Sequence, residues 1–120
     1  MDLNHPVVKL CIEGSQAEFE GRQADAFALY WQAWQAAQDD YGACIAAHYV
    51  ARCQETPEGI FRWNHEALER ADSSQNSAVL DFYPSLYLNM GHSYELMGNL
   101  NEARRYYDLA AGLGAVHQPE

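Results

Sequence analysis

Cysteine, histidine and glutamate side chains lie at spacings that would place them on shared helix faces. Cys44 precedes His48 by four residues, and His92 precedes Glu95 by three. Residues three or four apart are neighbours on a helix surface. Because thiolate and imidazole groups are ligands of soft metals, Cys44, His48 and His92 are candidates for a metal site. Cys44, His92 and Glu95 could likewise supply a nucleophile, a base and an orienting acid.

Neither chemistry has support from the surrounding sequence. The chain has no nucleophile turn, no glycine-rich phosphate cradle and no paired set of acids. Its three cysteines form no CxxC pair, and a free cysteine in a helical core is most often a small apolar filler. We therefore expect no enzyme activity, no cofactor and no bound metal. Reduced thiols of this kind fit a cytoplasmic protein.

The charge balance argues against nucleic acid as a partner. The 120 residues carry 17 Asp and Glu against 7 scattered Lys and Arg, a formal net charge of -10. A DNA or RNA binder needs clustered basic side chains to neutralise phosphates. No apolar run approaches the roughly 20 residues that cross a bilayer, and no basic segment followed by an apolar one opens the sequence. We expect no nucleic-acid partner, no membrane segment and a cytoplasmic location.

Helix-forming residues run through most of the chain, and glycines and prolines fall where helices would start or stop. Six helices are expected, at residues 6–20, 22–38, 40–54, 57–71, 77–97 and 100–113. Pro84 either kinks the fifth helix or marks its true start. Residues 72–77 are all polar and form the one convincing loop.

The last two expected helices carry a pattern of large and small residues. Gly91 and Ala103 are small enough for two helices to approach closely, and Gly98 permits a tight turn between them. The full pattern is Tyr87, Met90, Gly91, Tyr94, Gly98, Ala103, Tyr107 and Ala110. The same spacing recurs near the N-terminus in Leu10, Gly14, Ala17, Gly21, Ala26, Tyr30 and Ala33. A middle pair follows it more loosely, because its turn is one residue longer and Ile60 replaces a small residue.

This pattern resembles the tetratricopeptide repeat (TPR). The resemblance implies an all-α, antiparallel helix-pair solenoid of about six helices, formed by a single domain over residues 1–120. Its repeats would cover approximately residues 7–39, 40–83 and 84–117. The last two repeats are spaced by about 44 rather than 34 residues. About ten extra residues in the region 72–83 would therefore lengthen the fifth helix or form an ordered loop.

TPR proteins usually bind a peptide or partner helix in a concave groove lined by the first helix of each pair. The resemblance therefore implies a non-enzymatic protein-protein interaction module, whose groove residues would be Cys44, His48, Arg52, Ser85, Leu88, Asn89, His92 and Glu95. Family members that hold chaperone C-terminal carboxylates use Lys, Arg and Asn at positions that here are Cys11, Ser15, Ile45, Ser85 and Asn89. Four of these five positions differ, so an acidic chaperone tail is not expected.

Self-association is expected at the C-terminal end of the array. TPR arrays commonly end in an extra polar helix, and too few residues follow Leu113 to form one. The apolar face with Tyr106, Leu109 and Leu113 would then be free to form a homodimer. Two alternatives stay open for the function. One is a purely structural, self-associating scaffold, and the other is a small-ligand or metal sensor that uses the groove histidines.

Overall fold

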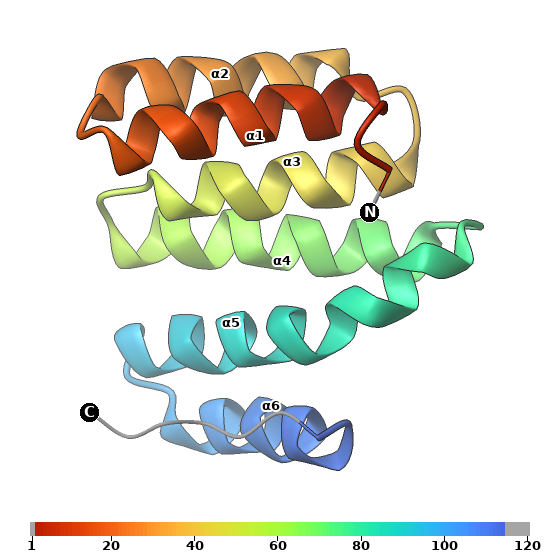
Figure 1. Cartoon of the computed structure of the whole chain (residues 1–120). Helices are drawn as coiled ribbons and strands as arrows, with labels where there is room; N and C mark the ends of the chain where they lie inside the picture. Colours follow the sequence, from red (N-terminus) through yellow and green to blue (C-terminus); the bar gives the residue numbers. More distant parts are fainter. Residues whose placement is uncertain (1, 115–120) are drawn as a thin grey trace.

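A computed structural model of the chain describes residues 2–114 (Figure 1). This part of the chain is all-α, as the sequence predicts, and contains no strand. The described elements are α1 (Pro6–Phe19), α2 (Gln23–Ala36), α3 (Asp40–Arg52), α4 (Pro57–Ser73), a 3-10 helix η1 (Ser77–Phe82), α5 (Tyr83–Leu96) and α6 (Leu100–Gly112). Residues 115–117, the end of the predicted third repeat, lie outside the described residues.

The helix boundaries follow from local capping chemistry. The side chains of Asp39, Thr56 and Asn99 each accept a hydrogen bond from a backbone amide in the first turn of α3, α4 and α6, at 2.7, 3.0 and 3.2 Å respectively. Gly21 and Gly98 follow α1 and α5 with φ of +80° and +81°, a left-handed conformation that favours glycine. These residues produce the tight turns that fold each helix back on its predecessor.

The helices pack as three antiparallel pairs, α1 with α2, α3 with α4 and α5 with α6. In Figure 1 the pairs stack one on the next, from α1–α2 at the top to α5–α6 at the bottom. Neighbouring pairs meet through α2 and α3 and through α4 and α5, and α1 also packs on α3. The predicted helix-pair solenoid is therefore confirmed, with a core shared between successive pairs.

The first and last pairs contain the same contact between a glycine and a tyrosine ring. A Cβ atom added at Gly14 would lie 2.4 Å from Tyr30 Cε1, and one added at Gly91 would lie 2.5 Å from Tyr107 Cε1. Only glycine lets the paired helices approach this closely, because real Cβ atoms stay more than 3.0 Å from such neighbours. Gly91 follows Gly14 by 77 residues and Tyr107 follows Tyr30 by the same 77, so the first and last pairs have this contact at matching positions.

The middle pair has an alanine and an asparagine at the corresponding places in α3 and α4, instead of a glycine and a tyrosine. Ala47 is buried on α3, and buried Asn64 lies eight residues after the cap of α4, where Tyr30 lies in α2. Four residues, 53–56, connect its two helices, whereas three residues, 20–22 and 97–99, connect the others. The longer turn predicted for this pair is therefore present.

The connection between α4 and α5 agrees with one of the two alternatives for Pro84 and corrects the bounds of the predicted loop. Helix α4 continues through Ser73, so the non-helical loop is residues 74–76 rather than 72–77. The expected helix over 77–97 is divided into η1 and α5, and Pro84 lies in the first turn of α5. Of the two predicted roles, Pro84 therefore marks the start of the fifth helix. Val79 of η1 is buried, which fixes the 3-10 helix against the core.

None of the helices in residues 2–114 is both long and apolar enough to cross a membrane.

Candidate functional site

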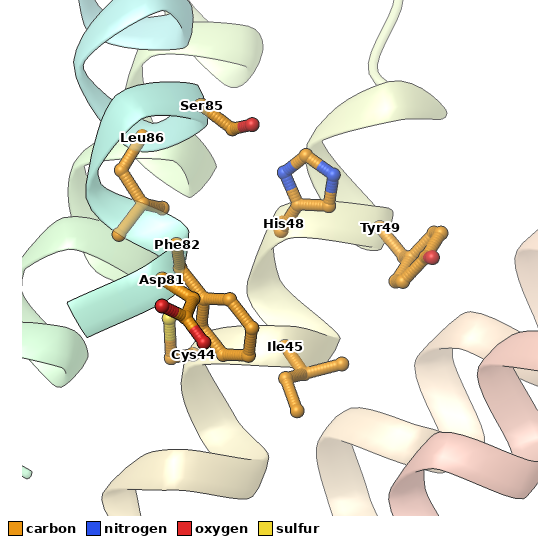
Figure 2. A pocket seen from close by; sticks show the side chains of 8 residues that line it. All are labelled: Cys44, Ile45, His48, Tyr49, Asp81, Phe82, Ser85 and Leu86. Atoms are coloured by element: carbon orange, nitrogen blue, oxygen red, sulfur yellow. The ribbon is translucent and has the colours of Figure 1, made fainter. Parts of the chain in front are cut away.

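A pocket opens between α3, η1 and α5, and its cavity volume is about 180 Å³ (Figure 2). Four residues of α3 line one side, two residues of η1 form the floor and edge, and two residues of α5 close the other side. These residues are Cys44, Ile45, His48, Tyr49, Asp81, Phe82, Ser85 and Leu86. The pocket therefore lies on the face formed by the first helices of the second and third pairs.

The 3-10 helix is the element that gives the pocket its shape. Phe82 stacks on Tyr41 of α3, with ring centroids 5.9 Å apart and planes inclined by 25°. Nearby, the Tyr83 hydroxyl donates a hydrogen bond to Asp72 of α4 at 2.6 Å. These contacts hold η1 across the end of the second pair. The extra residues predicted from the repeat spacing are therefore ordered, and they form part of the pocket wall.

His48 lies on the α3 side of the pocket, opposite Ser85 in Figure 2. Asn89 Nδ2 lies 3.2 Å from His48 Nδ1. Because an amide nitrogen donates, Nδ1 is the acceptor and the neutral ring carries its proton on Nε2. Burial lowers the pKa of His48, and the nearby Arg52 guanidinium lowers it further. The imidazole is therefore a neutral donor, held edge-on to Tyr49 at a centroid distance of 5.1 Å.

A chain of hydrogen bonds connects His48 to the second helix of its own pair through α5. Asn89 contacts His48, and its backbone carbonyl accepts a hydrogen bond from the Ser93 hydroxyl at 2.7 Å. Asn64 of α4 donates to the Ser93 hydroxyl oxygen at 2.9 Å. Asn64 and Ser93 are both buried, so this chain satisfies polar groups that water does not reach. It fixes α5 against α3 and α4 and thereby sets the width of the pocket.

Cys44 lies in the pocket wall and is 1% exposed. Burial, together with a smaller effect from the charge of Asp72, raises the pKa of its thiol to about 12. The thiol is therefore protonated at neutral pH, whereas nucleophilic attack and metal binding require the thiolate. His92, the third residue of the hypothetical metal site, is exposed and does not line the pocket. Within residues 2–114, no group of three or more His, Cys, Asp and Glu side chains could hold a metal ion.

The structure brings Cys44, His48 and Ser85 together in the pocket, and Asn89 joins them through His48. The other predicted groove residues lie outside it. Arg52 is exposed and forms an ion pair with Glu18 of α1 at 2.6 Å.

Two further predicted groove residues also lie outside the pocket. Leu88 is half-buried, and Glu95 is exposed. The Glu95 carboxylate accepts a hydrogen bond from the Tyr107 hydroxyl. Burial raises the pKa of Tyr107, and this hydrogen bond raises it further. Sequence reasoning missed Tyr49, Asp81, Phe82 and Leu86 as site residues.

The predicted self-association face divides into a packed part and an exposed part. Tyr106 is half-buried and stacks on Tyr94, with centroids 5.7 Å apart and planes inclined by 18°. Leu109 and Leu113 are 40% and 54% exposed. Tyr106 therefore belongs to the third pair's own packing, and the two leucines form the exposed part.

In comparisons with known proteins, no family model matches the chain, and neither a curated protein nor a solved structure matches it. The structure alone thus defines the class of the molecule, a solenoid of helix pairs with an apolar pocket between two of its first helices.

Proposed function

We propose that this chain is a TPR-like, non-enzymatic interaction module of the cytoplasm that binds a peptide or partner helix across α3 and α5. The observation that carries the proposal is the pocket between these helices, which receives one side chain of the partner. Helix-pair arrays present their first helices as a binding surface, and recognition of an extended or helical segment uses such pockets as anchor points.

The size and lining of the pocket favour a side chain over a cofactor. Its volume of about 180 Å³ is below the roughly 300–1,000 Å³ of typical small-molecule sites. Four of the eight lining residues are aliphatic or aromatic, and the Cys44 thiol adds a fifth apolar surface. The neutral His48, the Ser85 hydroxyl and the Asp81 carboxylate add polar groups. Such a site binds an apolar side chain of the partner by burying it. The polar groups of the site then orient the partner's backbone.

The electrostatics of Cys44 also support binding over catalysis. A protonated thiol with a pKa of about 12 offers no nucleophile at neutral pH. Cys44 instead contributes a small apolar surface to the pocket wall.

The second candidate function is a self-associating scaffold, and the exposure of Leu109 and Leu113 favours it. Leu109 of α6 and Leu113, the residue that follows the helix, would bury their apolar surface in a homodimer. This role is compatible with the first, because the pocket is formed by α3, η1 and α5 and the two leucines lie at the end of α6.

Peptides selected by phage display against the purified protein test the first proposal. We expect Ser85→Arg, which places a long side chain at the pocket mouth, to weaken binding of a selected peptide by at least about tenfold, the loss expected on removing an interface hot spot. The matched control is Gln32→Arg on the exposed surface of α2, which adds the same charge away from the pocket and should leave the affinity unchanged. Equal affinity for both variants would contradict the proposal.

A further inference from the structure

Asp81 is an acid at the edge of the apolar pocket. Its side chain is exposed and forms no hydrogen bond or ion pair with any of the residues 2–114. Other acids near this part of the fold do have partners, since Asp40 pairs with Arg70 at 3.0 Å and Asp72 accepts from Tyr83 at 2.6 Å. In Figure 2 the Asp81 carboxylate lies beside the ring of Phe82, at the level of Ile45. Asp81 therefore presents an uncompensated negative charge next to an apolar cavity.

The elements around the pocket supply no free cation to balance this charge. Arg52 is the one Lys or Arg in α3, η1 and α5, and its guanidinium already pairs with Glu18 at 2.6 Å. The chain as a whole has a formal net charge of -10. Asp72 adds a second negative charge close enough to act on the thiol of Cys44 in the pocket wall. The electrostatic potential at the pocket mouth is therefore negative, and it favours a cationic ligand over an anionic one.

We propose that the pocket recognises an apolar side chain carried beside a basic one, a Lys or Arg that pairs with Asp81. The inference rests on the proposed function, and it adds the chemical class of the partner: a segment with an aliphatic or aromatic anchor and a neighbouring cation. The neutral His48 ring, protonated on Nε2, and the Ser85 hydroxyl can donate hydrogen bonds to the segment's carbonyl groups. An acidic segment would face Asp81 without compensation.

The recognising charge comes from η1, the element that interrupts the regular helix-pair plan. Phe82, the neighbour of Asp81, is held in place by its stacking on Tyr41, and this contact also fixes the backbone position of Asp81. A pair between exposed charges contributes about a 1.5- to 5-fold gain in affinity. This gain decreases with added salt, because the charges are exposed.

Three probes that share a phenyl ring separate anchor recognition from charge recognition. They are 2-phenylethylamine, a cation at neutral pH, the neutral 2-phenylethanol and the anion 3-phenylpropanoate. We would titrate each into isotopically labelled protein and follow the amide NMR signals of residues 44–49 and 81–86. The expected order of affinity is amine, alcohol and carboxylate, with the amine binding about 2- to 5-fold more tightly than the alcohol.

Asp81→Asn removes the carboxylate while keeping the size of the side chain, and it should remove most of the preference for the amine over the alcohol. Asp108→Asn on the exposed surface of α6 is the matched control, because it changes the net charge by the same amount away from the pocket. The control should retain the preference for the amine. Circular dichroism melting curves confirm that both variants are folded.

The outcomes distinguish the role of the cation from the proposed function, binding of a partner side chain in the pocket. Equal binding of the three probes at the pocket, or a preference that is undiminished in Asp81→Asn, would overturn the role of the cation and leave the side-chain pocket standing. If none of the probes moves the pocket signals, the cavity does not accept an apolar group, and both proposals fall.

Discussion

The contact between Gly14 and Tyr30 provides a quantitative test of the helix-pair architecture. In Gly14→Ala the new Cβ would lie 2.4 Å from Tyr30 Cε1, about 1 Å closer than ordinary van der Waals contact. The ring is fully buried, and its hydroxyl is held by Glu18 at 2.7 Å, so it has little room to move. Overpacking of this kind costs about 1–3 kcal/mol, and the tight site places the cost near about 3 kcal/mol. Alanine recovers about 1 kcal/mol of helix propensity, which leaves a net loss of about 2 kcal/mol in the free energy of unfolding.

Urea unfolding followed by circular dichroism measures this loss. Gly112→Ala is the control, because Gly112 is helical and an added Cβ there meets no atom within 4 Å. It should stabilise the protein by up to about 1 kcal/mol. In a Tyr30→Leu background the ring is absent, so Gly14→Ala should change from destabilising to neutral or stabilising. An equal loss in both backgrounds would refute the close approach of α1 and α2 as the cause.

Three further predictions concern the polar chain, the pH dependence and the C-terminal face. Ser93→Ala should lower the free energy of unfolding by about 1–3 kcal/mol, measured in urea, because it leaves the buried Asn64 amide without its acceptor; an unchanged midpoint would contradict this. Because the pKa of His48 is lowered below its ordinary value of 6.5, the unfolded state binds more protons, and stability should fall as the pH drops below about 6.5. Urea unfolding at pH 7.5 and 5.5 should show a smaller difference for His48→Gln, and an identical difference would count against a lowered pKa for the half-buried His48 ring. Leu109→Arg should convert a homodimer of twice the chain mass of 13.6 kDa into a monomer in light scattering; a wild-type monomer would exclude this interface.

Local signals were enough to predict the elements and their pairing. Thr56 followed by Pro57 marks the start of α4, and Gly98 marks the turn before α6, because caps and left-handed glycines act within a few residues. The small residues Gly14 and Gly91 indicated which helices would approach closely, and the structure has the tyrosine contacts that explain them.

The pocket could be predicted only in part. The spacing between the middle and last repeats showed that extra residues were present, but their 3-10 conformation depends on the stacking of Phe82 on the distant Tyr41. Asp81 was missed because an isolated acid in an acidic chain carries no local signal. Helical spacing also could not tell that His48 lines the pocket and His92 does not. That difference depends on how α3 and α5 pack against each other.

NMR mapping of a bound peptide shows whether a partner segment binds across α3 and α5. A peptide selected by phage display would be titrated into labelled protein while the amide signals of the whole chain are followed. We expect the largest shifts in residues 44–49 and 81–89, around the pocket and the hydrogen bond from Asn89 to His48. Shifts confined to α2 or to α6, with the pocket signals unmoved, would contradict it.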